Sequence, residues 1–170
     1  MFGIIHAHTM YSLDDSAQTP EELVVRAKEL GIHNVALTDH GTLLGIDDFL
    51  AAGKKHGINA IPGIEAYLEN RRHFILIAKD LEGYRSISKA LRDAQEQQVK
   101  IRNRTYSIMD DTILRKHFMG NCHVIATSAC ISGPIASILL QGRRLQREKQ
   151  KLEGKMETLK EFFLTWQNTE

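Results

Sequence analysis

The chain has 170 residues and a formal net charge of +1 at pH 7, which gives no strong bulk attraction for nucleic acid. Its hydrophobic fraction of 42% and charged fraction of 25% are close to the globular average and exclude a disordered tail, a collagen-like repeat and a long coiled coil. No apolar run reaches the roughly 20 residues of a membrane helix, and no signal peptide is evident. With two cysteines, the sequence predicts a cytoplasmic, reducing location.

Short apolar runs alternate with amphipathic stretches along the chain. In order, the sequence predicts strand 2–5, helix 20–30, strand 34–38, helix 46–56, strands 58–64 and 73–78, helix 82–99, strand 122–127 and helix 141–161. The first helix has the clearest start, because Thr19 is a candidate N-cap, Pro20 suits the first turn and Glu22 completes a capping box. Strands that alternate with helices predict βαβ units in a parallel sheet or barrel.

Side chains that bind metals recur where the predicted strands end. His6 and His8 are two residues apart at the end of the first strand, so their imidazoles are expected on one face. The others are Asp15, Asp39, His40, Glu65, His73 and Cys130. A single histidine or cysteine is more often structural, but repetition at successive strand ends favours a zinc, manganese or iron site.

Several segments resemble the PHP (polymerase and histidinol phosphatase) domain, in the form found at the N-terminus of bacterial DNA polymerase III alpha subunits. The matching segments are HAHTMYSLDD (6–15), ALTDHG (36–41), IPGIEAY (61–67), FILIAK (74–79), EGYR (82–85) and ATSACISG (126–133). Their order and spacing match over residues 1 to about 140. The resemblance implies a distorted seven-stranded β/α barrel with a divalent metal cluster of zinc, manganese or magnesium at its mouth.

The resemblance also assigns the ligands position by position. They fall on His6, His8, Asp15, His40, Glu65, His73 and Cys130. Asp14 competes with Asp15, which the Tyr-Ser-Leu-X-Asp pattern favours, and Asp39 is expected to orient ligands or backbone. The implied activity is phosphoester hydrolysis on DNA or a phosphate ester, of the 3′–5′ exonuclease type in DNA replication. The alternative is a non-catalytic metal-binding or structural module of a replicative polymerase complex.

The second part of the chain departs from the family pattern. The family's late Asp-X-His pair is not found, since the last histidine is His123 and residues 131–170 contain no aspartate. Five strands are also too few for seven, so residues 1–140 are expected to form a partial PHP-like domain and residues 141–170 a C-terminal amphipathic helix and tail.

Three explanations stay open for this departure. The chain is the product of a split or truncated gene, a degenerate domain, or a protein whose barrel is completed by a second chain. Docking of that chain would use the apolar stripe from Leu145 to Phe163. Arg71, Arg72, Arg102 and Arg104 are candidates for lining an entry path for a polyanion, although the sequence does not place them near the metals.

Overall fold

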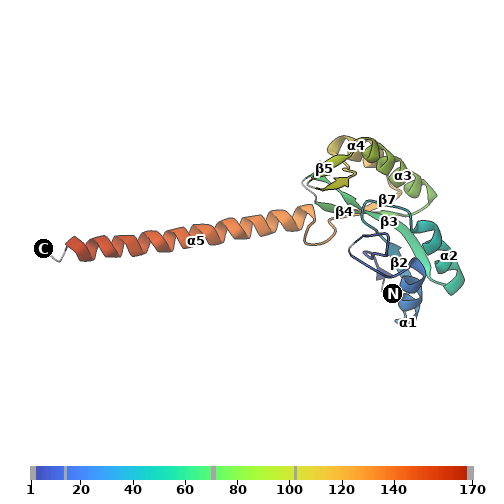
Figure 1. Ribbon diagram of the computed structural model, residues 1–170, viewed down its shortest axis with the longest axis horizontal. Helices are drawn as coiled ribbons and strands as arrows, with labels where there is room; N and C mark the ends of the chain where they lie inside the picture. Colours follow the sequence, from blue (N-terminus) through green and yellow to red (C-terminus); the bar gives the residue numbers. More distant parts are fainter. Residues whose placement is uncertain (1–2, 14, 70–71, 102, 168–170) are drawn as a thin grey trace. The chain divides into compact units, whose positions relative to one another are not determined.

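A five-stranded mixed sheet with the strand order β1-β2-β3-β4-β7 forms the centre of residues 1–134 in the computed structural model (Figure 1). The structure describes residues 3–13, 15–69, 72–101 and 103–167, of which 155–167 are described by backbone alone. The strands are β1 (Gly3–Ile4), β2 (Asn34–Leu37), β3 (Asn59–Tyr67), β4 (His73–Ala78) and β7 (Val124–Thr127). A mixed α/β fold with five strands in an incomplete barrel was predicted, and it is confirmed.

The direction of the strands differs from the expected parallel sheet. β1, β2 and β3 are parallel, but β4 is antiparallel to β3, and β7 is antiparallel to β4. The prediction is therefore wrong for β4, because residues 68–72 are too few for the crossover that a parallel pair requires. As a result, the end of β3, the start of β4 and the end of β7 meet at one edge of the sheet.

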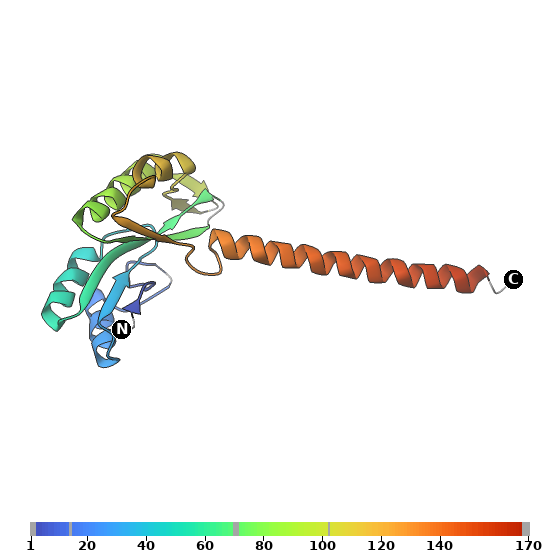
Figure 2. The same cartoon turned by 180° about the vertical axis from the view of Figure 1, so that it is seen from behind.

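Helices cover the sheet in two pairs (Figures 1 and 2). α1 (Pro20–Glu29) and α2 (Ile46–His56) pack on β2 through a core that includes Val24, Val35 and Phe49. α3 (Leu81–Glu96) and α4 (Asp111–Phe118) pack on β3 and β4 through a second core. The predicted capping box at the start of α1 is present, with Thr19 and Glu22 bonded to each other's backbone N–H.

Most other differences from the prediction concern short elements. β3 runs unbroken through Pro62, where an interruption was expected. α3 ends at Glu96, and the residues after it form a hairpin of β5 (Val99–Ile101) and β6 (Arg104–Tyr106) that was not predicted. α4 was not predicted either. β7 begins two residues later than expected, at Val124, and Phe2 of the first predicted strand lies outside the described residues.

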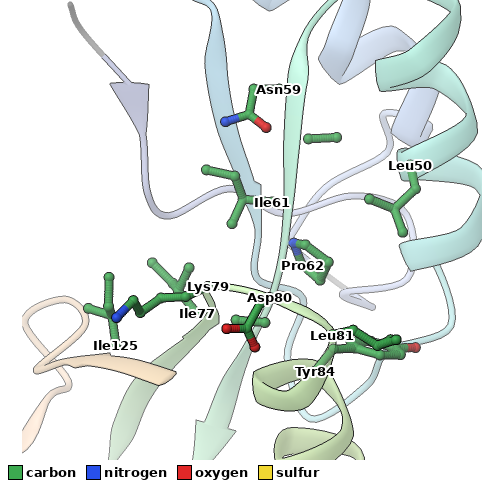
Figure 3. A pocket seen from close by; sticks show the side chains of 12 residues that line it. Leu50, Asn59, Ile61, Pro62, Ile77, Lys79, Asp80, Leu81, Tyr84 and Ile125 are labelled. Carbon is green, nitrogen blue, oxygen red and sulfur yellow. The ribbon is translucent and has the colours of Figure 1, made fainter. Parts of the chain in front are cut away.

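A cavity of about 630 Å³ lies at the edge of the sheet opposite to the end of β3. Figure 3 shows its wall from Leu50 of α2 and Tyr84 of α3 to Ile77 and Ile125 of the sheet. Its charged residues already have partners. Lys79 Nζ donates to the Cys122 carbonyl at 2.7 Å, and Asp80 accepts from Gly83 N at 3.0 Å and lies 2.7 Å from His123. Despite its size, this cavity therefore lacks the convergent polar groups of a reaction site.

Residues 135–170 form a separate unit, and α5 (Pro134–Gln167) supplies its helix. The helix is longer than the predicted segment 141–161 at both ends. The domain boundary at residue 140 stays a prediction. Among the described residues, no helix is both long and apolar enough to span a membrane.

Candidate metal centre

The edge of the sheet where β3 ends brings together the predicted metal ligands. His6 and His8 follow β1, His40 follows β2, Glu65 lies near the end of β3, and His73 begins β4. The antiparallel direction of β4 explains why a residue at the start of that strand joins residues at the ends of others. Four histidines, from the connections after β1 and β2 and from the start of β4, thus surround one carboxylate.

Glu65 is the centre of this cluster, with a side chain that is only 1% exposed. Its Oε2 lies 3.1 Å from His6 Nε2, 3.2 Å from His8 Nε2 and 3.2 Å from His40 Nδ1. Its other oxygen, Oε1, lies 3.0 Å from His73 Nδ1. Each carboxylate oxygen therefore has nitrogen neighbours of its own, which is the arrangement a bridging carboxylate requires.

The cluster shifts the pKa values of its members in opposite directions. Burial favours neutral Glu65, but hydrogen bonds with His73 and His8 and the charges of His40 and His6 outweigh burial and hold the Glu65 pKa well below its usual range. Burial also opposes protonation of His8, yet Glu65 raises the His8 pKa overall. Burial lowers the pKa of His40, and together with the charge of His8 it outweighs the opposite effect of Glu65. Glu65 is thus a carboxylate at neutral pH.

Asp39 holds the loop around Thr9 and Ser12 by hydrogen bonds, and its role in orienting ligands stays a prediction. It is 2% exposed and accepts hydrogen bonds from Thr9 N at 2.7 Å, Thr9 Oγ1 at 2.7 Å and Ser12 Oγ at 2.6 Å. The Ser12 proton is committed to Asp39, because a carboxylate only accepts. Ser12 Oγ must then accept from His8 Nδ1, 2.9 Å away, and neutral His8 keeps its lone pair on Nε2, toward Glu65.

His40 carries the most direct sign that this site fits a cation. Its Nε2 lies 2.5 Å from Asp15 Oδ2, so neutral His40 donates there and has a lone pair on Nδ1. Nδ1 is buried and, among the described residues, has no hydrogen-bond partner, although Glu65 Oε2 is 3.2 Å away. Two lone pairs facing each other in a buried site repel, and a cation between them would remove that cost.

The spacing of the donor atoms also suits metal ions. Ligands that each lie about 2.1 Å from one metal are separated by about 3.0–3.4 Å, and the contacts around Glu65 have this separation. In three groups of residues, the donor atoms of each group lie within 4.8 Å of one another. The groups are His6–His8–Glu65, His8–Asp15–His40 and His40–Glu65–His73. Because the groups share residues, the described side chains offer adjoining positions for more than one ion.

Cys130 lies at the rim of the cluster. Its Sγ is 3.9 Å from Glu65 Oε1 and accepts from Ser132 N at 3.4 Å, while the residue itself is exposed. Asp14, the competitor of Asp15, lies outside the described residues, as do Arg71 and Arg102. The geometry thus gathers all seven predicted ligands, six of them closely, and their role as ligands stays a prediction.

Sequence reasoning missed the hydroxyl and aromatic groups around the cluster. Tyr67 stacks on His40 with ring centroids 5.6 Å apart, and burial raises its pKa to about 12. Ser12 and Thr9 bind Asp39, as described above. The signal for them was present, since Ser12 and Tyr67 belong to the segments 6–15 and 61–67 that carry the resemblance, but neither residue type is a usual metal ligand.

Comparison with known proteins identifies the family. The family model described as "PHP domain" matches residues 5–168 of this chain, which includes most of α5. The chain belongs to the PHP domain family. The family match therefore extends past residue 140, where the sequence resemblance was expected to end.

Curated relatives of this PHP domain are much longer proteins. The DNA polymerase III subunit alpha of Helicobacter pylori (strain J99 / ATCC 700824) is 37% identical over 145 residues, which are 79% of this chain and 11% of that protein. The same subunit of Treponema pallidum is 34% identical over 162 residues, and that of Borreliella burgdorferi is 32% identical over 177 residues. The chain spans 11–15% of the length of these three relatives.

Solved structures match a smaller part of the chain. A candidate metal-dependent phosphoesterase from Bifidobacterium adolescentis is 32% identical, with a TM-score of 0.44, and the match covers 55% of this chain and 33% of that one. An amidohydrolase from Chromobacterium violaceum, solved with bound sulfate and no metal, is 28% identical, with a TM-score of 0.46 and the same coverage.

Proposed function

We propose that this PHP domain is a metal-dependent phosphoesterase that hydrolyses phosphodiester bonds, in the manner of a 3′–5′ exonuclease linked to DNA replication. The observation that supports this most is the convergence of four histidines on buried Glu65, with Asp15 beside His40. The family membership and the alpha-subunit relatives point to the same chemistry on DNA.

One group of residues would hold the cations, and another group orients these residues. His6, His8, His40 and His73 offer nitrogens, and Glu65 and Asp15 offer oxygens, a donor set that favours zinc or manganese over magnesium. Bound divalent ions lower the pKa of a coordinated water and neutralise phosphoryl oxygens. Ser12 and Asp39 keep the His8 lone pair directed to the cluster.

The test measures metal content and turnover in the full chain. Bound metal is quantified by mass spectrometry, and hydrolysis of bis(p-nitrophenyl) phosphate and of an end-labelled single-stranded oligonucleotide is followed with added Mn²⁺. We expect His8→Ala to abolish both activities and to lower metal content. His56→Ala is the matched control, since His56 pairs with Glu21 on α1, 2.8 Å away.

The alternative is a non-catalytic metal-binding or structural module. The clustered histidines and Glu65 support it as well, because they could hold a cation whether or not a substrate reacts there. Bound metal without His8-dependent turnover would support this alternative and reject catalysis. A chain that binds no metal would reject both.

A further inference from the structure

A cavity of about 510 Å³ opens beside the histidine cluster. Besides His40, its wall includes the aromatic residues Tyr11, Tyr67 and Tyr106 and the cation Arg104. The volume falls within the range of pockets that bind small organic ligands. Such a combination of aromatic rings and a guanidinium is suited to a ligand that has both a flat ring system and a negative charge.

A second cavity, of about 290 Å³, connects this wall to the cluster itself. It is lined by Asp15 and His73 as well as by Tyr67, Arg104 and Tyr106. Arg104 and Tyr106 therefore line both cavities. They stand between the place where a phosphoryl group would react and the place where the rest of a substrate would lie.

Ring contacts fix the position of Tyr106 relative to the cluster. Tyr106 is partly buried and meets Tyr67 edge-on, with ring centroids 4.9 Å apart, and Tyr67 in turn stacks on His40. Tyr11 is also fixed, because its hydroxyl donates to Asp48 at 3.3 Å and its ring packs against Gly45, where an added Cβ would come within 2.7 Å. Little rotamer freedom is left to lose when a ligand binds.

Arg104 brings positive charge to the same wall. It lies on β6 of the hairpin, is exposed, and is close enough to Tyr67 for its charge to oppose the rise in the Tyr67 pKa. A guanidinium binds phosphate oxygens through paired N–H donors, in a geometry that lysine cannot provide. The hairpin thus presents Arg104 and Tyr106, two residues apart and on one face of the strand.

We propose that this cavity binds one nucleotide unit of the substrate, with its base against Tyr106 and Tyr11 and a phosphate at Arg104. The proposal rests on the proposed function and adds to it the residues that would hold one nucleotide of the substrate. The same nucleotide unit occurs in a free nucleoside monophosphate and at the end of a DNA strand.

Equilibrium binding tests the proposal without requiring turnover. Binding of thymidine 5′-monophosphate, tetrathymidylate and inorganic phosphate to the chelator-treated full chain is measured by calorimetry. We expect Tyr106→Leu to weaken the binding of both thymidine ligands by about 5- to 100-fold, which is the contribution of one stacked base, and to leave the binding of phosphate unchanged. Tyr106→Phe should bind as the parent does, and Arg104→Gln should weaken all three ligands.

Controls separate this proposal from the function on which it rests. Arg115→Gln removes an exposed arginine of α4 that pairs with Asp111, so its binding should equal that of the parent. Tighter binding of tetrathymidylate than of the monophosphate assigns the cavity to a DNA end, and the reverse assigns it to free nucleotides. Unchanged nucleotide binding in both the Tyr106→Leu and Arg104→Gln chains overturns the proposal, even where His8-dependent hydrolysis is intact. Binding that depends on these residues supports it even where hydrolysis is absent.

Discussion

At the scale of single residues, one hydroxyl determines which nitrogen of His8 faces Glu65. Ser12 Oγ donates to Asp39 and accepts from His8 Nδ1. We expect Ser12→Ala to lower metal affinity by about 10- to 100-fold, because removal of a residue that orients a histidine ligand typically costs that much. Competition with a chromogenic chelator measures the change.

Ser16 supplies the control in the same loop. Its hydroxyl accepts from Gln18 N at 3.3 Å and not from the His8 imidazole, so Ser16→Ala should keep the affinity of the parent chain. Equal affinities in the Ser12→Ala and parent chains would show that His8 does not depend on Ser12 for its orientation.

A second residue-scale prediction concerns the loop that carries Cys130. A Cβ added at Gly133 would lie 1.6 Å from the Ser128 carbonyl oxygen, so Gly133→Ala must displace the loop. We expect the free energy of unfolding to fall by about 1–3 kcal/mol. Urea unfolding measures it, with Gly142→Ala in α5 as the control, because that position has open space around it. Equal midpoints for both variants would contradict the prediction.

The position of a residue after or before an apolar run could predict several members of the cluster. His6, His8 and His40 are visible as ligand types at strand ends. Tyr106 was not predicted as a site residue, and Arg104 was a candidate for an entry path that the sequence did not place near the metals. Both lie on a hairpin whose strands are three residues each, which was not predicted. Whether such a segment folds over the end of a neighbouring strand depends on tertiary contacts, among them the Tyr67–Tyr106 ring contact.

At the scale of elements, one carboxylate joins α3 to α4. Asp93 Oδ2 on α3 lies 2.7 Å from Lys116 Nζ and 2.7 Å from His117 Nε2 on α4. Hydrogen bonds from Lys116 and His117 hold the Asp93 pKa well below its usual range. A carboxylate whose pKa is lower in the folded than in the unfolded chain stabilises the fold at pH values above its unfolded pKa, which is about 3.9 for aspartate. This contribution is lost as the pH falls further.

Thermal unfolding between pH 7 and pH 2 tests this link. We expect Asp93→Asn to lower the melting temperature at pH 7, and the difference from the parent chain to shrink as Asp93 itself becomes protonated in acid. Asp111→Asn is the control, because Asp111 pairs with Arg115 of its own helix, so its effect should be smaller. A difference that persists undiminished to pH 2 would contradict the assignment to Asp93.

The elements with strong local sequence signals were predicted, and the features that depend on the length of a connection between strands were not. α1 has a capping box and an N-terminal proline, so its start follows from sequence alone. The reversal at β4 follows from the short 68–72 connection, and continuous apolar runs do not encode strand direction. α4 has Asp110 as its N-cap, but its eight residues are too few for the apolar pattern to predict a helix.

At the scale of the whole molecule, the five-stranded sheet positions the cluster, and some apolar side chains of the sheet stay exposed. Ile5 is 57% exposed and Ile125 49% exposed, and both belong to or adjoin strands of the five-stranded sheet. The partial barrel was expected because five predicted strands are too few for the seven-stranded barrel that the PHP resemblance implies. A sheet with such surfaces gains stability from a partner that covers them.

The exposed surface of α5 carries apolar side chains at a regular spacing. Ile138, Leu145 and Leu152 are seven residues apart and 58%, 59% and 61% exposed, and the sequence continues this spacing with leucine at 159 and tryptophan at 166. A seven-residue apolar repeat is typical of helices that pair along one seam. We propose that two chains associate through α5, which would bury this stripe.

Sedimentation equilibrium of the full chain tests this association. We expect the average mass to rise with concentration toward that of a dimer, and Leu145→Lys with Leu152→Lys to keep the chain monomeric, since two lysines on one seam repel and must be desolvated. Gln146→Lys places the same charge beside Leu145 outside the stripe and should dimerise like the parent. A chain that is monomeric at every concentration rejects the second copy as partner.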